Sequence, residues 1–454
     1  MIKQISALAG IAIAAAGVAL LPLGTVPVGS ASNVAEFDVQ AKALSLICPG
    51  AAMNTGGASG TAVGAFNRIG AATISKTSTV GITGTDVGGA TLLTAAGATE
   101  QGSTALNAGQ LQNAASARLN GLLGASCQAP SAQHWLVGGD TGTGRETLLL
   151  LSNPSSVPAT VNLTVFAEGG PVSASGLSGI AVSAGATQVV PLSSVIPETR
   201  AFAVEVQSRG AAIGAWMQQR TVRGLLYAGA DFVSPLTEIN TSLVLPGILI
   251  RGAKDAAAII ATNADYQDLV PALRVFNPSE KTATFTAQIY GANDKTFGTV
   301  IRESVPAQSA KDFNLNGLAD GDYVGFITSD QSVAAAVRLP RTDKTKKPNT
   351  DFTWLQAAQQ LTGTQQITVP SGGISKLSLA NPTSKPATVL VNGTSITLKA
   401  QGVAVLKADA GAVNLKITEG KIAANLVVDI SGAVTNLGLV DYRNSGSRVA
   451  VIVR

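Results

Sequence analysis

A pattern of apolar and polar positions occurs three times along the chain, each time around an Asn-Pro pair. The stretches are "LLLLSNPSSVPATVNLTV" (148–165), "LRVFNPSEKTATFTAQI" (273–289) and "LSLANPTSKPATVLV" (377–391). Two and four residues before each Asn, and eight and ten residues after it, the side chains are apolar. A spacing of two is the period of a β-strand with one buried face. We therefore predict a strand on each side of every Asn-Pro pair.

The Asn-Pro pair itself predicts a tight turn. An Asn side chain can hydrogen-bond the backbone two residues on, and Pro fixes φ while keeping its predecessor out of the helical region. Two strands joined by a short turn are typical of a hairpin, so we predict a hairpin in each copy. The pairs are Asn153 with Pro154, Asn277 with Pro278, and Asn381 with Pro382.

Further strand signals follow each copy at similar distances. "VSAG", "VPAQ" and "LKAQ" each precede another apolar stretch, and polar turns between alternating runs, as in "VGFITSDQSVAAAV", predict further hairpins. Many short strands without long amphipathic segments between them indicate antiparallel β-sandwiches. The predicted fold is all-β, with three tandem Ig-like sandwich repeats at residues 130–240, 241–345 and 362–454.

The segments outside the repeats have a different composition. Residues 1–32 carry no charge after Lys3, which predicts a signal peptide or, if it stays uncleaved, a membrane anchor. Residues 33–129 are rich in Gly, Thr and Ala, so we expect loops with short strands at most, and one weak helix from Leu106.

A basic run separates the second predicted repeat from the third. It contains Lys344, Lys346 and Lys347, followed by Pro348 and Asn349. Basic residues beside turn residues, without aromatic or helical context, are typical of a solvated linker rather than a recognition surface. We assign residues 346–361 to this linker.

The two cysteines of the chain, Cys48 and Cys127, are predicted to form one disulfide. Exported chains meet oxidising conditions, and no His or third Cys lies near either residue to suggest a metal site. The bond would close the Gly/Thr-rich region and contribute roughly 4 kcal/mol on a loop-entropy model. Two buried free thiols are the alternative.

The composition excludes some classes of protein. Charged residues make up 13% of the chain and apolar residues 46%, which favours a globular protein over a disordered one. The formal net charge is +4, and its basic residues are spread along the whole length. We therefore expect no nucleic acid among the partners.

Side chains that carry chemistry are scarce. His134 is the only histidine, and a Ser or Cys nucleophile needs a base beside it. The sequence has no G-x-S-x-G elbow, and "ADGDY" at Ala319 is typical of an Asp-Gly turn rather than a calcium loop. We predict no catalytic residue, no metal site and no cofactor. A pair of carboxylates that meets only in three dimensions stays open.

Exposed aromatic side chains could bind a glycan, and Trp216 and Trp135 are the candidates. In "IGAWMQ" Ile213, Ala215 and Met217 share one face of the predicted strand, so Trp216 faces the other way. The matching positions of the other repeats are Ala336 and Asn425, so no aromatic platform is repeated. We favour packing over ligand contact for Trp216, because large aromatic side chains usually bury most of their area.

Several of these stretches together resemble a known family. A charge-free N-terminal segment, "CPG", "HWLVGG" before the first Asn-Pro stretch, "VPAQS" and "FTWLQ" resemble the actinobacterial envelope proteins grouped as domain of unknown function 5719. The resemblance covers most of the chain and is strongest over residues 133–355. It implies an exported or membrane-anchored protein rich in β-structure, and it brings no catalytic residues.

The function expected from the sequence is that of a non-catalytic protein of the cell envelope, outside the cytoplasmic membrane. Repeated β-units offer surface and spacing, whereas groups for catalysis are few. The expected partners are envelope proteins or cell-wall polysaccharide, and the membrane if the N-terminal segment is uncleaved. A cell-wall glycan-binding protein is the second hypothesis and a carboxylate-based hydrolase the third, because a fold alone does not decide function.

Overall fold

The structure is a computed structural model, and it describes residues 33–39, 42–55, 66–97, 103–116, 118–292, 298–342, 350–430, 432–440, 442–445 and 447–453. Strands dominate, and every ladder between the described strands is antiparallel, which confirms the all-β prediction. The helices described are α2 (Leu192–Val195), α3 (Ala253–Thr262) and the 3-10 helix η1 (Ala264–Leu269). The predicted signal or anchor segment and the three lysines of the basic run lie outside the described residues.

The chain divides into two units. Strand β1 (Asn33–Val39) pairs with β36 (Ser447–Val453) near the ends of the chain, so this ladder joins segments more than 400 residues apart in the sequence. The second, compact unit spans residues 40–446 and contains all other strands.

The first strand set of the compact unit forms two sheets. One sheet has the order β10-β16-β12-β13, with β14 also on β12, and the other has the order β15-β11-β17-β18. The strands are β10 (Gln133–Val137), β11 (Arg145–Ser152), β12 (Ala159–Ala167), β13 (Gly170–Val172), β14 (Ile180–Val182), β15 (Thr187–Pro191), β16 (Phe202–Arg209), β17 (Gly214–Arg223) and β18 (Leu226–Val233).

The second strand set is joined by one long strand, β24. Its first part pairs with β19 and β21, and its last part pairs with β20 and β25. Strands β22 and β23 lie at the outer edges. The strands are β19 (Asn240–Ile250), β20 (Ala272–Asn277), β21 (Ala283–Gly291), β22 (Thr299–Val305), β23 (Ser309–Asn314), β24 (Gly321–Thr342) and β25 (Thr350–Gln356).

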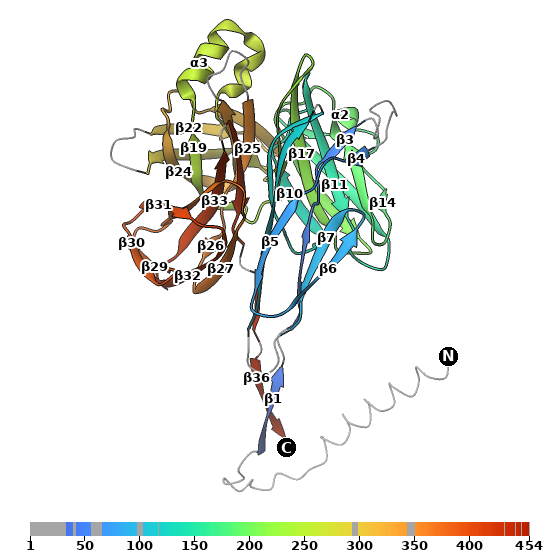
Figure 1. Ribbon diagram of the computed structural model, residues 1–454, viewed down its shortest axis with the longest axis vertical. Helices are drawn as coiled ribbons and strands as arrows, with labels where there is room; N and C mark the ends of the chain where they lie inside the picture. The colour runs from blue at the N-terminus through green and yellow to red at the C-terminus, as the bar shows by residue number, and fades with distance from the viewer. Residues whose placement is uncertain are drawn as a thin grey trace. The chain divides into compact units, whose positions relative to one another are not determined.

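The third strand set again forms two sheets. Their orders are β27-β32-β29-β30 and β26-β33-β28-β31, with β34 also paired to β33. In Figure 1 this set runs from orange to red and lies beside the second. The strands are β26 (Gln360–Leu361), β27 (Thr364–Val369), β28 (Ile374–Ala380), β29 (Ala387–Val391), β30 (Thr394–Leu398), β31 (Val403–Ala408), β32 (Gly411–Glu419), β33 (Ile422–Ile430) and β34 (Ala433–Gly438).

The hairpins predicted at the Asn-Pro pairs are wrong. In no set do the strands before and after the pair form a ladder: β11 and β12 belong to different sheets, as do β28 and β29, and β20 and β21 pair with different parts of β24. The later turns predicted as hairpins also pass between sheets, because β16 and β17 do not pair and "VGFITSDQSVAAAV" lies within the single strand β24. Alternating apolar positions fit both arrangements, since either places one face of each strand on a shared core.

The apolar positions that predicted the strands do face common cores. In the first set the alternate leucines of β11 and the alternate apolar residues of β12 belong to one buried cluster, and the second and third sets repeat this. The buried residues at these positions are Leu149, Leu151, Val161 and Leu163, then Leu273, Val275, Phe285 and Ala287, and then Leu377, Leu379 and Val389.

The Gly/Thr-rich region contains more regular structure than expected. A hairpin of β8 (Ser103–Ser116) and β9 (Leu119–Ser126) stands where we predicted a weak helix. Leu122 and Leu123 are neighbours in β9, and both are fully buried. A sequence buried on both faces does not reveal its period, so packing decides its conformation. The other strands are β2 (Leu44–Cys48), β3 (Met53–Thr55), β4 (Phe66–Arg68), β5 (Thr73–Ser78), β6 (Ile82–Val87) and β7 (Ala90–Ala95), with β35 (Arg443–Ser445) on β8.

The end of the predicted linker is also a strand. Residues 350–356 form β25, which pairs with β24 along its whole length and is almost entirely buried. Residues 360–361 form β26, which pairs with β33. The turn residues that suggested a linker therefore lie just before a strand of the core.

Candidate functional site

Four strands from different parts of the chain meet at the middle of the compact unit. Strand β9 packs against β18 and β34, and β25 packs against the same two strands. Each of these strands pairs with a neighbour in its own sheet, and no ladder joins any two of these four described strands. Side chains must therefore satisfy the backbone groups that face this middle.

The strands β18, β25 and β34 contribute residues from matching positions of the three sets. The residues three positions before Asn153, Asn277 and Asn381 pair with Trp216, Ala336 and Asn425, as the sequence register predicts. Three residues further along, Gln219, Leu339 and Val428 pair with Asp231, Thr353 and Thr435. Asp231, Thr353 and Thr435 are thus equivalent residues of the three sets.

Both threonines among these equivalent residues hydrogen-bond the side chain of Asp231. The Thr435 hydroxyl donates to Asp231 Oδ1 at 3.0 Å, and the Thr353 side chain also hydrogen-bonds Asp231. Asp231 Oδ1 further accepts from the Gly124 N–H of β9 at 2.8 Å. We call Asp231, Asp351, Thr353 and Thr435 the convergence centre, because the three strand sets and the N-terminal hairpin meet there.

Asp351, in β25, binds the other strands of the convergence centre through their backbone. Its Oδ2 accepts from Leu122 N at 2.9 Å and Val434 N at 3.2 Å, and its Oδ1 accepts from Ala230 N at 3.1 Å. β9 comes so close that a Cβ on Gly121 would lie 2.5 Å from Ala230 N, and the φ of Gly121 is +148°. Glycine is required at that position for both reasons.

Burial sets the electrostatics of the convergence centre, and no basic side chain of the described residues forms an ion pair with its carboxyl groups. Burial raises the pKa of Asp351 to about 7, against four backbone hydrogen bonds that lower it. Burial also raises the pKa of Asp231 well above its ordinary value, and the nearby charge of Asp351 adds to the rise. These carboxyl groups hold strands together, and a reactant has no access to fully buried groups.

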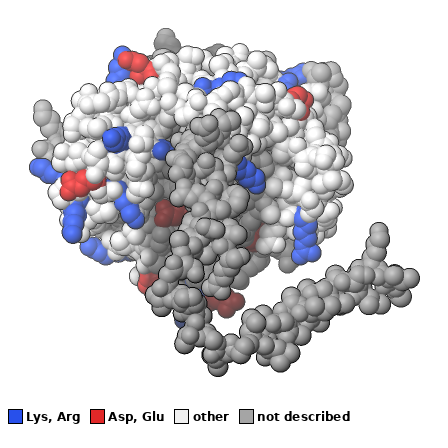
Figure 2. Space-filling view, turned by 90° about the horizontal axis from the view of Figure 1, so that it is seen from below, with Lys and Arg blue, Asp and Glu red and all other residues white. Residues whose placement is uncertain are grey.

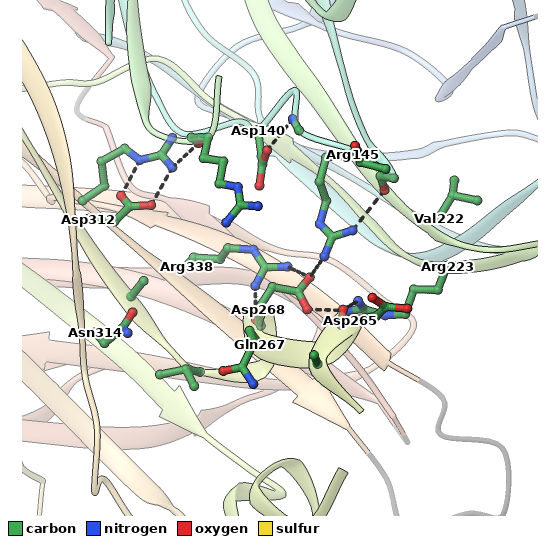
Figure 3. Close-up of a pocket in the computed structure, with 18 of the residues that line it drawn as sticks. Asp140, Arg145, Val222, Arg223, Asp265, Gln267, Asp268, Asp312, Asn314 and Arg338 are labelled. Atoms are coloured by element: carbon green, nitrogen blue, oxygen red, sulfur yellow. Dashed lines mark hydrogen bonds and ion pairs between the residues drawn. The ribbon is translucent and has the colours of Figure 1, made fainter. Parts of the chain in front are cut away.

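A large open cleft lies between the first and second strand sets. Its volume is about 780 Å³, within the usual range of small-molecule sites. Five arginines and four aspartates line it, and we call it the arginine cleft (Figure 3). The charged residues are Arg145, Arg200, Arg223, Arg274, Arg338, Asp140, Asp265, Asp268 and Asp312.

Three of these arginines converge on the single carboxylate of Asp268, in η1 (Figure 3). Arg223 and Arg145 lie 2.5 and 2.8 Å from its oxygens and Arg338 lies 3.2 Å away. Burial alone would raise the pKa of Asp268, but the guanidinium groups outweigh it and hold the pKa below the ordinary value. One negative charge therefore faces three positive charges.

Arg274 is fixed by a separate ion pair at the same cleft. Its guanidinium donates two hydrogen bonds to Asp312, at 2.7 and 2.8 Å, and one to the Gly139 carbonyl at 2.7 Å. It also lies over the Trp354 ring, 4.5 Å from the centroid. The bidentate pair with Asp312 is the strong form of an Arg–carboxylate pair and lies within the second set. The hydrogen bond to the Gly139 carbonyl joins the second set to the first.

Asp140, like Asp265, is a cleft carboxylate for which no ion pair is found among the described residues. The Asp140 Oδ1 accepts from Gly142 N at 2.8 Å. Burial raises its pKa, although that hydrogen bond and the charges of Arg274, Arg145 and Arg338 oppose the rise. Asp140 and Asp268 thus line one cleft with pKa values shifted in opposite directions.

A second cleft, of about 380 Å³, is lined by amide and aromatic side chains. Trp135 is half-buried at its wall, and its ring packs 5.4 Å from the Phe276 ring and 5.9 Å from the Phe166 ring, centroid to centroid. We call it the amide cleft. Its polar lining includes Gln128, Gln133, Gln356, Gln359, Asn436 and Tyr442.

The structure places the other sequence-predicted residues as follows. The Cys48–Cys127 disulfide is formed, which confirms that prediction. Trp216 is fully buried in an apolar cluster. It therefore packs in the core, as we favoured, and does not form an exposed platform for a ligand. His134 is buried with its Nε2 2.7 Å from the Ile213 carbonyl oxygen, and burial lowers its pKa.

The Asn-Pro motif has the same geometry in all three sets. The Oδ1 of Asn153, Asn277 and Asn381 accepts from the backbone N–H two residues on, at 3.0, 3.0 and 2.9 Å, as predicted. Each Asn Nδ2 also donates to the carbonyl four residues on, at 2.8, 2.7 and 2.7 Å. A second donation reaches Val182, Val305 and Leu398, at the end of a later strand, so each Asn fixes the crossing between sheets.

The family of the chain follows from a comparison of sequences. A family model described as a family of unknown function, DUF5719, matches residues 80–415, well over half of the 454 residues. The chain belongs to the DUF5719 family. The part matched by the DUF5719 model includes every residue that lines the arginine cleft. A search of curated proteins finds no match.

Sequence reasoning missed both the convergence centre and the arginine cleft. Asp231 and Asp351 stand in apolar strands, where a lone acidic residue is a signal that we did not use. Arg274 stands in the apolar half of an Asn-Pro stretch, at the position of Leu150 and Ser378, and was a similar signal. Asp268 gave none, because its three partners are 45 to 123 residues away in sequence.

Among the described residues, no group of three or more His, Cys, Asp and Glu side chains could hold a metal ion. In the same residues no helix is long and apolar enough to cross a membrane. The space-filling view in Figure 2 shows lysine and arginine side chains scattered over the face turned to the viewer, without a continuous basic patch there.

Proposed function

We propose that this DUF5719 protein is a non-catalytic protein of the actinobacterial cell envelope whose three tandem Ig-like β-sandwiches brace or bind other envelope components. Sandwich repeats at residues 130–240, 241–345 and 362–454 would account for the recurrent strand order. The linker between the second and third repeats is then shorter than the sequence suggested, because β25 belongs to the second.

The convergence centre is the observation that carries this proposal. Equivalent residues of the three strand sets meet at Asp231, and buried carboxyl groups tie them to β9. Repeats joined by flexible linkers would move independently, whereas repeats that share a polar centre move as one body. A rigid body that presents several sheet surfaces suits a structural or partner-binding role.

The proposed location is outside the cytoplasmic membrane, either secreted or anchored by residues 1–32. The Cys48–Cys127 disulfide supports this location, because disulfides persist in oxidising compartments. Both sulfur atoms are buried and the bond closes a segment of 79 residues, so it serves the fold rather than redox chemistry. Labelling of intact cells with an impermeant reagent, followed by fractionation, tests the location; an intact cytoplasmic pool would contradict it.

Glycan binding is the second candidate, and the amide cleft is the observation that favours it. A partly exposed Trp135 beside glutamine and asparagine side chains offers a stacking surface and neutral hydrogen-bond partners for a sugar. Trp216 cannot take part, because it is fully buried.

One capture experiment separates these candidates. The protein is immobilised and exposed both to envelope protein extracts and to purified cell-wall polysaccharide, alongside the Trp135→Ala variant. A scaffold retains defined proteins equally in both forms, whereas a glycan binder retains polysaccharide and loses it with Trp135→Ala. Thermal unfolding of the variant serves as control for folding, and Val157→Ala, at an exposed position in the first Asn-Pro stretch, is the matched surface control.

A carboxylate-based hydrolase is the third candidate. The opposite pKa shifts of Asp140 and Asp268 are the pattern of an acid paired with a carboxylate nucleophile. Both oxygens of Asp268 are held by arginines, however, which leaves it poorly suited to attack a sugar. The absence of glycan turnover by the wild-type protein would remove this candidate.

A further inference from the structure

The arginine cleft carries more positive charge than its own carboxylates neutralise. Five arginines and four aspartates line it, so one positive charge remains in excess when every aspartate is ionised. Arg145, Arg223 and Arg338 crowd around Asp268 as their shared ion-pair partner. The fourth arginine, Arg274, is matched by Asp312. Guanidinium groups that crowd one carboxylate repel each other, and a second anion would relieve that repulsion.

The fifth arginine supplies a group that reaches solvent. The Arg200 side chain is exposed and lines the cleft, and no partner of its guanidinium is found among the described residues. Only its backbone carbonyl is engaged, by Arg274 Nη2 at 2.8 Å. The backbone of Arg200 is therefore held in place, while its guanidinium group stays available to bind a ligand at the cleft.

The remaining lining of the cleft fits a small organic ligand. Val222, Val270, Ala272 and the Trp354 ring provide apolar wall. Cavities of this volume usually combine apolar wall with a few placed polar groups. Arginine recognises planar oxyanions through paired N–H groups, which suits both a carboxylate and a phosphate.

We propose that the arginine cleft binds a small ligand bearing a carboxylate or phosphate group, with Arg200 contacting the anion and the cluster around Asp268 attracting it. This site is distinct from the scaffold surfaces and does not depend on the proposed function. The chemistry shared by the two kinds of ligand is the oxyanion, so a sugar acid and a phosphate are tested separately.

Titration calorimetry of the full chain with inorganic phosphate and with glucuronate tests the proposal. Three proteins are compared: the wild type, Arg200→Gln, and Arg302→Gln as a matched control on the edge strand β22, outside the cleft. We expect saturable binding of at least one anion and a loss of about tenfold or more in affinity for Arg200→Gln, the size of one charge-assisted hydrogen bond. Arg302→Gln should bind as the wild type does.

The outcomes are distinct. Binding of phosphate but not glucuronate identifies a phosphate-bearing ligand, and the reverse identifies a carboxylate. No saturable binding of either anion at millimolar concentrations overturns the proposal, as does an equal loss in both variants, which would indicate unspecific attraction. Arg200→Gln should unfold at the wild-type temperature because its side chain is exposed, so weaker binding cannot be ascribed to misfolding.

Discussion

The convergence centre contains buried aspartates and the arginine cleft half-buried ones, and the groups around these carboxylates differ. At the convergence centre, Asp351 and Asp231 face backbone N–H groups and hydroxyls, and their pKa values are raised. In the arginine cleft, Asp268 faces three guanidinium groups, and its pKa is lowered. An aspartate at the convergence centre is therefore uncharged or ionised only at a cost in free energy. The aspartate that accepts from three arginines in the cleft is instead a stable anion.

The difference separates a structural task from a binding task. Neutral donors satisfy a carboxylate without adding charge, so the convergence centre is complete as it stands and closed to solvent. An arginine cluster around one carboxylate keeps an excess of charge and remains open. Each of the following predictions changes one carboxylate and asks whether its region behaves as this comparison requires.

The largest effect is expected from Asp351→Ala. The substitution removes the acceptor of Leu122 N, Ala230 N and Val434 N, which belong to three different strands. A buried donor without a partner costs about 1–3 kcal/mol, so the variant should lose about 3–5 kcal/mol of unfolding free energy, measured in urea.

Asp409→Ala is the control for that measurement. Asp409 is paired with Lys407, but both side chains are highly exposed, so the change should leave the unfolding free energy almost unchanged. An Asp351→Ala protein as stable as this control would mean that the strands are held together without the convergence centre.

Asp268→Asn should lower the unfolding free energy by a smaller amount, about 2 kcal/mol, and the loss should respond to added anions. The substitution leaves three guanidinium groups without their anion, which destabilises the cleft, but the site retains contact with solvent that screens the charges. Added phosphate should restore part of the loss for this variant and none for Asp351→Ala. Equal responses of the two variants to phosphate would contradict the distinction between the regions.

The sequence predicted the strands well because burial on one face leaves a period of two. The Asn-Pro turns, their hydrogen bonds and the register that relates Trp216, Ala336 and Asn425 were all predicted from local spacing, and the structure has them. Whether two adjacent strands pair or cross between sheets is not encoded in that spacing. Both arrangements place the same residues inward, so the hairpins were wrong.

The candidate sites could be predicted far less well. The convergence centre brings Asp231 together with Asp351, Thr353 and Thr435, and no local pattern relates strands so far apart in the sequence. The helix predicted from Leu106 failed for the same reason, because β9 is buried by β18 and β34, which come much later in the sequence. Packing between distant segments overrides the local signal in both cases.

The pH dependence of stability should separate the two regions as well. Because the pKa of Asp351 is raised to about 7, the folded state holds a proton that the unfolded state releases near pH 4, so the contribution of this group is lost as pH rises toward 7. The stability of the wild type relative to Asp351→Asn should therefore fall by about 2 kcal/mol between pH 5 and 8. His134, whose lowered pKa acts in the opposite direction, is present in both proteins and largely cancels.

The Asp268→Asn variant provides the contrast at the same pH values. A lowered pKa means that Asp268 is ionised in both states above pH 5, so its contribution is lost only under more acidic conditions. The stability difference between this variant and the wild type should be flat from pH 5 to 8. A flat difference for Asp351→Asn would contradict the raised pKa at the convergence centre.

The smallest effect is expected from Asp140→Asn, which tests the one carboxylate that combines the features of both regions. Asp140 lines the arginine cleft, yet burial raises its pKa as at the convergence centre. Asparagine keeps an oxygen that can accept from Gly142 N, and it removes a charge that burial disfavours, so the unfolding free energy at pH 7 should change by less than about 1 kcal/mol. Anion affinity in the cleft should rise slightly, because one negative charge is gone. If the wild type instead hydrolyses a cell-wall glycan and Asp140→Asn abolishes that turnover while remaining folded, Asp140 is a catalytic acid, and the cleft belongs to an enzyme.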